Sequence, residues 1–265
     1  FCFGCSLADH RPTPCGLIKL WLRKCADDSE TSNWICANTK ECPRCQTAIE
    51  KNGGCNHMKC YKCQKDFCWI CPVEWTSYSH QCSKFLEEPS ETSKTQSRSA
   101  LQRYLHYFTR FANHEQSAKL DAQLSEKIAT RMLAMQDCAD MSWIEAQFLA
   151  RAKGTLLAAR NTLKWTYCLA FYLDKGSNRA LLFEDNQADL EGAVEALSGL
   201  LESEGFDDPQ KVPELRKNIL DKAVYVGKRR DVLLEAAGRD LVEGKFTWQF
   251  DESTARNLKA SKLSW

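Results

Sequence analysis

Apolar side chains follow a helical pattern in the later part of the chain and lack one in most of the earlier part. Beyond residue 100 they recur every three or four residues, as on helices that bury one face. One such run consists of Leu120, Leu124, Ile128 and Met132. Residues 83–99 carry no sustained apolar period and are rich in serine, threonine and charged side chains, so they predict a linker.

Start and stop signals divide the later part into separate helices. Ser142 followed by Glu145 forms a capping-box signature, which predicts a helix start at that point. Residues 174–178 break the apolar period and are expected to end this long helix. Asn186 with Asp189 is interpreted as the start of the next helix. The apolar face of that next helix consists of Leu190, Val194, Leu197 and Leu201.

Two prolines mark the start of the last helix. Pro209 and Pro213 precede a long helical pattern that is expected to continue to about Gly244. Antiparallel helices joined by short connections form a bundle around an apolar core. Residues 100–265 are therefore predicted to form an all-α helical bundle. The aromatic residues expected in its core are Tyr104, Tyr107, Phe108 and Phe111.

Cysteine usage sets the earlier part of the chain apart. Most of the 15 cysteines lie before residue 83, in CxxC pairs interleaved with histidine. In a chain with no signal-peptide pattern, such pairs are typical of zinc ligands in a reducing compartment, so a cytoplasmic or nuclear location is expected. The formal net charge of +1 gives no reason to expect a nucleic-acid or membrane partner. Because the chain begins at Phe1, within a CxxC pattern, we expect a fragment of a longer protein.

The first candidate metal site lies at the start of the chain. A CxxC pair, a histidine and a further cysteine are spaced so that a short loop can wrap one tetrahedral zinc ion. These ligands are Cys2, Cys5, His10 and Cys15. Zinc knuckles that bind single-stranded RNA have the same spacing but need exposed aromatic and basic residues, which Phe1, Phe3 and Arg11 barely provide. A structural site is therefore expected, followed at residues 16–39 by a helical connector with an apolar stripe that includes Trp21.

Residues 41–82 hold eight cysteines and two histidines, enough to bind two further zinc ions. Three CxxC pairs are unambiguous ligands, namely Cys42 with Cys45, Cys60 with Cys63, and Cys68 with Cys71. In a cross-braced RING finger, the remaining ligands are Cys55 and His57. In a sequential arrangement, the remaining ligands are His80 and Cys82. One ion is then held by Cys42, Cys45, Cys60 and Cys63, and the other by Cys68, Cys71, His80 and Cys82.

The choice between these assignments decides whether Cys55 is a free thiol, and spacing alone satisfies both. Gly53 and Gly54 place Cys55 on a permissive turn, so the local sequence favours the sequential arrangement. Residues two apart on an extended backbone project to the same side, so Cys55 and His57 have the parts of a thiol catalyst. Thiolate-rich zinc sites are negatively charged and tend to raise a neighbouring thiol pKa. Activation of the thiol would therefore have to come from His57 or from the substrate.

Longer motifs are similar to a known family of enzymes. Two of them resemble the RING2 domain of RING-between-RING ubiquitin ligases, namely IEKNGGCNHMKC and KDFCWIC. The first motif of the chain resembles the end of the in-between-RING (IBR) domain that precedes RING2, with the pattern CFGC…H…C. Four motifs of the later part resemble the Ariadne domain, namely YLHYFTRFANHEQSAKLD, MSWIEAQFLARA, LAFYL and FEDNQADLEGAVEALSGLLE. The chain is thus identified as a member of the Ariadne family.

The resemblance implies a division of the chain into domains. Residues 1–15 correspond to the end of the IBR domain, 16–39 to a helical connector, 40–82 to RING2, 83–99 to a linker and 100–265 to the Ariadne domain. The expected fold class is therefore small zinc-stabilised modules with short β-hairpins, followed by an all-α helical bundle. The first RING of the family has no counterpart in this sequence.

The family also implies roles for particular residues. Its GGC cysteine, here Cys55, accepts ubiquitin as a thioester from an E2 enzyme and passes it to a lysine of a protein substrate. The following histidine, here His57, acts as the general base. Some relatives carry a glutamate two residues before the CWxC motif, where this chain has Asp66. The resemblance favours the sequential zinc assignment, and thus three zinc ions per chain.

Regulation and partners are implied by the family as well. The Ariadne domain covers the catalytic cysteine, and the candidate contacts are Leu120, Asp121 and Glu202. Leu120 is smaller than the aromatic residue expected there. The implied partners are ubiquitin, an E2 enzyme bound through the missing first RING, a protein substrate and neddylated cullin–RING ligases as activators. The main alternative is a non-catalytic RING-like zinc-binding module in which Cys55 and His57 are zinc ligands.

Overall fold

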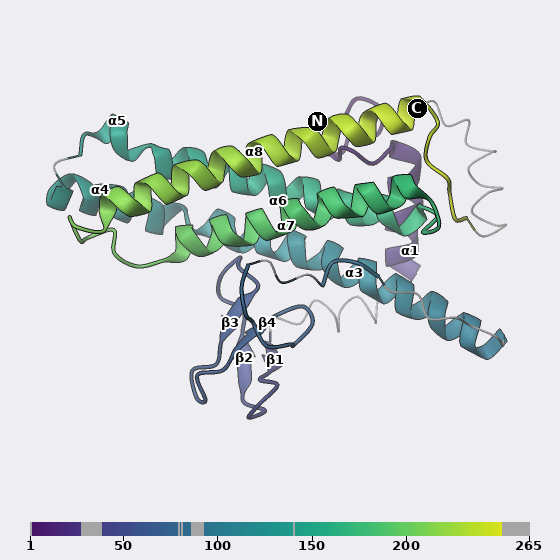
Figure 1. Ribbon diagram of the computed structural model, residues 1–265, viewed down its shortest axis with the longest axis horizontal. Helices are drawn as coiled ribbons and strands as arrows, with labels where there is room; N and C mark the ends of the chain where they lie inside the picture. Colours follow the sequence, from purple (N-terminus) through teal and green to yellow (C-terminus); the bar gives the residue numbers. More distant parts are fainter. Residues whose placement is uncertain are drawn as a thin grey trace.

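The computed structural model describes residues 2–27, 39–78, 80, 82–85, 93–139 and 141–250, with the side chains of 93–97 and of 138–139 outside the description. Long helices run side by side, and a small module of strands is attached to one flank of them (Figure 1). The fold class expected from the sequence is confirmed, since short strand pairs with Cys/His clusters precede a helical bundle. Within the described residues, no helix is long and apolar enough to cross a membrane.

Two antiparallel hairpins form the core of what we call the zinc module, the described residues between 39 and 85. Strand β1 (Thr39–Glu41) pairs with β2 (Ala48–Glu50), and β3 (His57–Lys59) pairs with β4 (Asp66–Cys68). Each hairpin turn carries one of the CxxC pairs. Strands this short bury little, so the module depends on metal for its folding free energy. Its apolar core consists of Cys42, Ile49, Met58, Cys60, Phe67 and Trp69.

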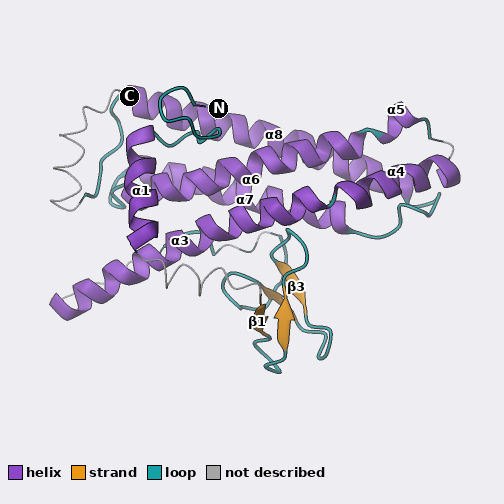
Figure 2. Cartoon of the chain, turned by 180° about the vertical axis from the view of Figure 1, so that it is seen from behind, coloured by secondary structure: helices purple, strands orange, loops and turns teal. Residues whose placement is uncertain are grey.

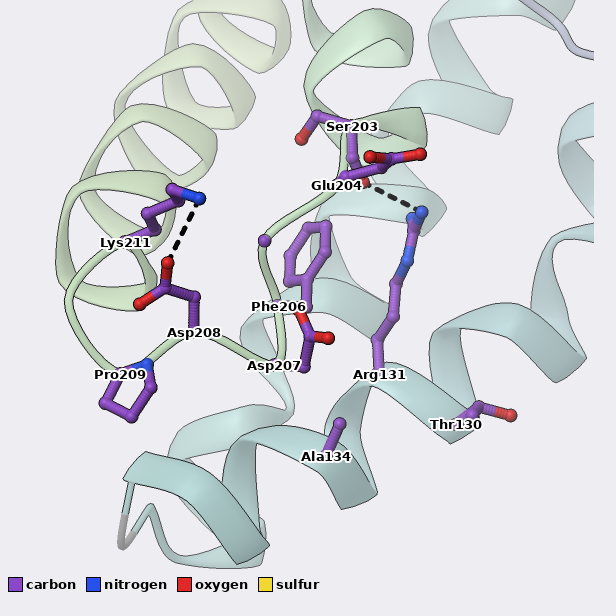
Figure 3. A pocket seen from close by; sticks show the side chains of 11 residues that line it. Thr130, Arg131, Ala134, Ser203, Glu204, Phe206, Asp207, Asp208, Pro209 and Lys211 are labelled. Carbon is purple, nitrogen blue, oxygen red and sulfur yellow. Dashed lines mark hydrogen bonds and ion pairs between the residues drawn. The ribbon is translucent and has the colours of Figure 1, made fainter.

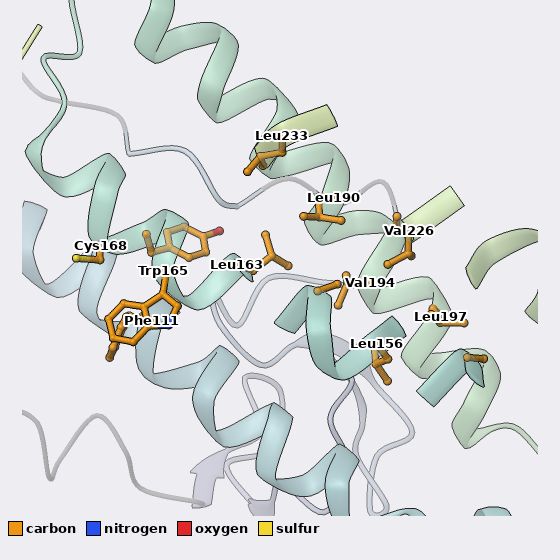
Figure 4. Packing of buried hydrophobic residues seen from close by; sticks show 14 of the residues in the cluster. Phe111, Leu156, Leu163, Trp165, Cys168, Leu190, Val194, Leu197, Val226 and Leu233 are labelled. Atoms are coloured by element: carbon orange, nitrogen blue, oxygen red, sulfur yellow. The ribbon is translucent and has the colours of Figure 1, made fainter. Parts of the chain in front are cut away.

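The helical bundle is built from long helices that bury one continuous core. These helices are α3 (Ser93–Gln123), α4 (Ser125–Ala139), α5 (Trp143–Ala146), α6 (Phe148–Tyr172), α7 (Asn178–Glu202) and α8 (Val212–Val242). Seen from behind, α3, α6, α7 and α8 lie side by side, and α1 (Cys15–Asp27) crosses them at one end (Figure 2). Apolar side chains of α6, α7 and α8 interdigitate between these helices (Figure 4).

Helix α1 belongs to this bundle, although the sequence predicted only a connector there. Its Trp21 is fully buried, and its ring lies 5.5 Å from that of Phe111 and 5.3 Å from that of Phe171. Leu17 and Ile18 of the same helix are buried in the same core. The apolar stripe predicted on the connector therefore docks onto the faces of α3 and α6, which fixes the first zinc loop against the bundle.

Helix α3 begins earlier than the sequence indicated. It starts at Ser93, inside the segment 83–99 that was expected to be a linker. The sequence there lacks apolar side chains, but serine, threonine, lysine and glutamine cost a helix little. A helix that is anchored further on by its core residues can therefore extend backwards through such a polar segment, which hydrophobic periodicity alone does not reveal.

The start predicted for α7 at Asn186 is wrong. The helix begins at Asn178, and Ser177 caps it by accepting a hydrogen bond from the N–H of Ala180. Asn186 lies inside the helix, where its side-chain amide donates to the carbonyl of Leu182 at 2.9 Å. An asparagine within a helix and one at a helix start have the same signature in sequence, because both bond to nearby backbone groups.

Other helix boundaries agree with the sequence. Ser142 and Glu145 form the expected capping box, but the helix that it starts ends after one turn, and α6 begins anew at Phe148. Pro213 lies in the first turn of α8, which ends at Val242, close to the expected stop.

Candidate functional site

Three groups of cysteine and histidine side chains each bring four ligand atoms within 4.8 Å of one another. The groups are Cys2, Cys5, His10 and Cys15; Cys42, Cys45, Cys60 and Cys63; and Cys68, Cys71, His80 and Cys82. Ligand sulphurs lie 3.5 to 3.6 Å apart in the first two groups. Zn–S bonds of ~2.3 Å in a tetrahedron place sulphurs roughly 3.8 Å apart, so the donors fit zinc. Three zinc ions per chain are therefore supported.

Histidine orientation agrees with metal binding in the first group. The Nδ1 atom of His10 lies 2.8 Å from the carbonyl oxygen of Thr13, which can only accept a hydrogen bond. Nδ1 therefore carries the proton, and Nε2 is the ligand atom, 3.2 Å from the sulphur of Cys5. The hydroxyl of Thr13 in turn donates to the carbonyl of Trp165 at 2.6 Å, which ties this zinc loop to α6.

Cys55 and His57 belong to none of the three groups within the described residues. His80 and Cys82 complete the second group of the zinc module, as the sequential arrangement requires. The described residues are thus grouped as the sequential arrangement predicts and not as the RING-like alternative does. Cys55 and His57 lie outside these groups, with His57 at the start of β3 and Cys55 two residues before it.

His57 has two partners that fix its ring. Its Nε2 lies 2.8 Å from Oδ1 of Asp66, which sits diagonally across the hairpin from it. The Trp75 ring stacks on the imidazole with centroids 5.0 Å apart and planes 16° apart. The structure therefore joins Asp66 to His57, a pairing that the sequence had suggested only through the family motif.

The carbonyl groups of the Cys55 turn are held from one side. Nζ of Lys51 donates to the carbonyls of Gly54 and Cys55, at 3.1 and 2.7 Å. Burial lowers the pKa of this lysine to about 8, although Glu195 raises it. Nη2 of Arg160 also donates to the Gly54 carbonyl, at 2.9 Å. These bonds connect the turn both to its own module and to α6 of the bundle.

The amide groups of the same turn point to carboxylates of α7. The N–H of Cys55 donates to Oε1 of Glu202 at 3.1 Å. The N–H of Asn56 donates to Oε2 of Glu195 at 2.5 Å, and its side-chain Nδ2 donates to Oε1 of the same residue at 2.9 Å. The next N–H, of His57, points to the sulphur of Cys55 at 3.4 Å.

Two glycines allow this close approach. A β-carbon at Gly53 would collide with the carboxylate of Glu202, and one at Gly54 would collide with that of Asp121. Any other residue would push the turn away from α7 at Gly53 and away from α3 at Gly54. The GG sequence before Cys55 is therefore needed for contact with the bundle as well as for the turn itself.

The thiol of Cys55 is buried by this contact. Its residue is only 6% exposed, and its sulphur lies 3.7 Å from the backbone carbonyl of Glu195. Burial, together with the charges of Glu195 and Glu202, raises the pKa of the Cys55 thiol well above its usual range. The hydrogen bond from the His57 N–H opposes this shift. In this arrangement, in which the zinc module is docked on the helical bundle, the thiol is covered and held in its neutral form.

The bundle's side of the contact is a buried charge network. Arg160 is fully buried, its Nε lies 3.1 Å from Oδ2 of Asp121, and its Nη1 pairs with Glu195. The Ser198 hydroxyl bridges Asp121 and Glu202, at 3.3 and 3.0 Å. Two of the three predicted contact residues, Asp121 and Glu202, thus lie at the turn. Leu120 is half-buried, with no polar contact to the turn.

Glu195, Arg160 and Ser198 were missed by sequence reasoning, although α7 carries a signal. Polar side chains recur along α7 at the spacing of a second helical face, at Glu191, Glu195, Ser198 and Glu202. A charged face beside an apolar one ordinarily faces solvent, so the pattern does not distinguish a docking face from an exposed one. Arg160 directly follows the apolar run of residues 156–159 in α6, which is the stronger hint of a buried charge with a partner.

Arg131 of α4 fixes the end of α7 that carries Glu202. A cavity of about 950 Å³ lies between α4 and the connection from α7 to α8, and Arg131 projects along it (Figure 3). The guanidinium donates to the carbonyls of Leu201, Glu202 and Ser203, and it stacks on the Phe206 ring at 4.6 Å. Arg131 therefore satisfies the last carbonyls of the helix and orients its final turn.

Comparison with known protein families agrees with the motifs. The model of the Ariadne domain matches residues 102–247. The chain belongs to the Ariadne family. Within this Ariadne chain, the model of the IBR domain matches residues 37–84, the segment expected to be RING2, so the name RING2 for that segment stays a prediction.

Curated relatives of this Ariadne chain carry one common description. E3 ubiquitin-protein ligase dbl4 of Schizosaccharomyces pombe is 52% identical over 257 residues, which cover 95% of this chain and 50% of the relative. E3 ubiquitin-protein ligase ARIH1 of Homo sapiens is 45% identical over 243 residues, covering 89% and 43%. E3 ubiquitin-protein ligase ariadne-1 of Drosophila melanogaster is 43% identical over 262 residues, covering 95% and 50%. The chain spans about half the length of these relatives.

Proposed function

We propose that the chain contains the catalytic and regulatory parts of a RING-between-RING E3 ubiquitin-protein ligase, with Cys55 as the residue that accepts ubiquitin. The observation that carries this proposal is the position of Cys55 outside the three described zinc groups, on a turn beside His57 and Asp66. Relatives described as E3 ubiquitin-protein ligases support it.

In the first step, the sulphur of Cys55 attacks the carbonyl carbon of a ubiquitin thioester on an E2 enzyme. A bond from Sγ to the ubiquitin carbonyl forms, and the bond to the E2 sulphur breaks. A thiol suits this exchange because it is a strong nucleophile near neutral pH and a good leaving group for the second transfer. We expect the E2 to bind a RING domain outside these residues.

In the second step, a substrate lysine attacks the thioester on Cys55. The lysine has a pKa of ~10.4 and must lose a proton to attack. Asp66, as a carboxylate, only accepts hydrogen bonds, so Nε2 of His57 carries its proton and Nδ1 is the basic nitrogen. His57 then takes the lysine proton at Nδ1, and Asp66 stabilises the imidazolium that forms.

The helical bundle would inhibit both steps in the docked arrangement. A thiol that is 6% exposed against Glu195 is reached slowly by a ubiquitin thioester, and a thiol with a raised pKa is a poor nucleophile. Release of the zinc module would remove both obstacles at once. Partners that favour the released form, for which neddylated cullin–RING ligases are the candidates, would act as activators.

Exchange with a chemically activated ubiquitin tests the catalytic claim without an E2. The chain is incubated with ubiquitin carrying a C-terminal mercaptoethanesulfonate thioester, and intact mass reports the adduct. We expect one ubiquitin that is released by excess thiol and is absent from Cys55→Ala. Cys25→Ala, which changes a cysteine outside the three zinc groups, is the matched control and should load normally. An adduct that persists in Cys55→Ala would refute the assignment.

Discharge of the loaded chain tests His57. His57→Ala should still load ubiquitin, but transfer to free lysine should slow by about 10²-fold or more, the usual contribution of a general base. Loading and discharge that slow by the same factor would instead indicate a structural role for His57.

A further inference from the structure

The amide groups of residues 55, 56 and 57 form a row on one side of the Cys55 turn. The carbonyls of this turn have donors of their own, and that of Gly54 also accepts from Nη2 of Arg160 at 2.9 Å. Lys51 binds those of Gly54 and Cys55, and the carbonyl of Asn56 accepts from the N–H of Trp69 at 2.8 Å. These bonds fix the peptide planes. The N–H groups of Cys55 and Asn56 point to α7, whose Glu195 carbonyl also lies 3.7 Å from the sulphur of Cys55, and the N–H of His57 points to that sulphur. Successive N–H groups arranged in this way bind anions.

The groups bound to this row in the docked arrangement are anionic oxygens. A carboxylate oxygen of Glu202 accepts from the N–H of Cys55, and one of Glu195 accepts from the N–H of Asn56. The other oxygen of Glu195 accepts from Nδ2 of Asn56. Three donors beside one thiol thus point to negatively charged oxygens at 2.5 to 3.1 Å. Each donor binds a different oxygen, and the distances of 2.9 and 3.1 Å lie in the range at which donors stabilise an oxyanion.

We propose that the N–H groups of Cys55 and Asn56, together with the side-chain amide of Asn56, form the oxyanion hole of the transfer reaction. Glu195 and Glu202 occupy it in the docked arrangement. This inference rests on the proposed function and adds a catalytic role for Asn56.

The donors stabilise the negative charge that develops on the carbonyl oxygen of ubiquitin during transfer. When the Cys55 thiolate attacks a thioester, a C–S bond forms and the π electron pair of the carbonyl moves to its oxygen. The resulting oxyanion accepts hydrogen bonds from the row. When the tetrahedral species collapses, the pair returns to the carbonyl, the second C–S bond breaks, and the leaving thiolate takes a proton from water. Donors that are already oriented need no reorganisation during this step.

Lys51 is the positioning residue of this arrangement. It is 2% exposed, and the hydrogen bonds of its Nζ go to two carbonyl oxygens of the turn. Its role is to hold these carbonyls so that the amides keep their orientation. Because these bonds lie within the zinc module, they persist when the module leaves the bundle and the carboxylates of α7 vacate the hole.

Two reactions of the same thiol separate this role from simple access. Exchange with the ubiquitin mercaptoethanesulfonate thioester passes through an oxyanion, whereas alkylation by iodoacetamide displaces iodide and forms none. Both rates are measured on the whole chain carrying Asp121→Ala and Glu202→Ala, which favours the released form. The ratio of exchange to alkylation cancels changes in the thiolate fraction, and the control variant below covers changes in access, so a fall specific to Asn56 reports the oxyanion donor.

Asn56→Ala in this background should lower the ratio by about tenfold or more, because loss of one oxyanion donor typically slows a reaction by 10²–10³. Asn52→Ala is the matched control, since it changes an exposed asparagine of the same turn region. Its ratio should stay within twofold of the background. Zinc content verifies folding. Asn56→Asp, which keeps the size of the side chain but replaces its donor by an acceptor, is measured beside Asn56→Ala and decides the test if Asn56→Ala loses zinc.

The outcomes are distinct. A ratio for Asn56→Ala and Asn56→Asp within twofold of the background would overturn the oxyanion hole and leave the proposed function intact. A released chain that is alkylated at Cys55 but never takes up ubiquitin would overturn the proposed function and the oxyanion hole with it. A fall in the ratio for both variants, with none for Asn52→Ala, would support the inference.

Discussion

The zinc module buries a few apolar side chains between three-residue strands, whereas the helical bundle surrounds a continuous core that extends from Leu17 in α1 to Phe246 after α8. The two cores are separate clusters. At the Cys55 turn, the two parts meet through charges and hydrogen bonds, with Arg160, Asp121 and Glu195 buried. A polar contact of this kind gives orientation with little net stabilisation, because burying charges costs nearly as much as pairing them gains. Such a contact would suit a module that docks accurately and that, as we propose, is also released.

Removal of the metal should reveal the largest difference between the zinc module and the helical bundle. Chelation should unfold the zinc module, whose folding free energy comes from its ligands, while the helical signal of the bundle persists. Helix α1 should persist as well, since Trp21 lies in the bundle core even though Cys15 is a zinc ligand. Metal analysis should give three zinc ions per chain, matching three groups of four ligands. Loss of the whole helical signal by circular dichroism would show that the bundle is not independent.

Arg160→Ala probes the charges at the contact. It leaves Asp121 and Glu195 buried without their cation, so it should destabilise the chain by about 3–5 kcal/mol, as is usual for breaking a buried ion pair. Arg179→Ala removes a partly exposed arginine that pairs with Asp240, and this control should cost about 1 kcal/mol or less. Urea unfolding measures both. Equal losses of unfolding free energy would mean that the buried charge network stabilises the chain no more than an exposed ion pair does.

Alkylation of Cys55 by iodoacetamide measures docking directly. Asp121→Ala with Glu202→Ala should raise the rate about tenfold or more, because each unit by which the thiol pKa falls raises the thiolate fraction tenfold. Glu204→Ala, which changes an exposed acid just beyond α7, is the control and should leave the rate unchanged. A rate that is equal in all three chains would contradict protection by the bundle.

Docking should also weaken with rising pH. The docked state holds the Cys55 proton more tightly, because its pKa is raised there. The stabilisation that this gives to docking is complete below the ordinary thiol pKa of ~8.5 and is lost as the pH rises above it, where the released state becomes a thiolate. The advantage of the double variant in alkylation should therefore shrink above about pH 8.5. A rate advantage of the double variant that grows with pH would contradict this prediction.

Asp66→Asn should have the smallest effect. An amide can still bond to His57 but stabilises its imidazolium less, so discharge onto lysine should slow by about tenfold or less while loading is unchanged. Asp66→Glu should stay near the wild-type rate. Discharge as slow in Asp66→Asn as in His57→Ala would instead make the carboxylate as important as the base.

The sequence predicted the zinc ligands because CxxC spacing is local. Each hairpin turn brings a pair of cysteines together whatever surrounds it, so only the choice between His80 with Cys82 and Cys55 with His57 remained open. The helical class of the later part followed from periodicity for the same reason. The start of α7 was misplaced because Ser177 and Asn186 offer similar local signals, and only the packed helix distinguishes them.

The contact at the Cys55 turn was harder to predict. Asp121 and Glu202 came from family resemblance, while Glu195 and Arg160 were missed, because a charge on a helix is ordinarily solvated. Their burial depends on the zinc module resting against α7, which no local pattern encodes. The orientation of the amides at residues 55 to 57 likewise depends on Lys51 and Trp69, which lie outside that run of amides.

The most direct test of the central claim compares ubiquitin uptake in the docked and released chains. The whole chain and its Asp121→Ala, Glu202→Ala variant are incubated with the ubiquitin thioester, and uptake at Cys55 is followed by intact mass. The variant should load about tenfold faster or more at unchanged zinc content, and Cys55→Ala should abolish loading in both. Equal loading rates, or loading that survives Cys55→Ala, would contradict a ubiquitin-accepting thiol covered by the helical bundle.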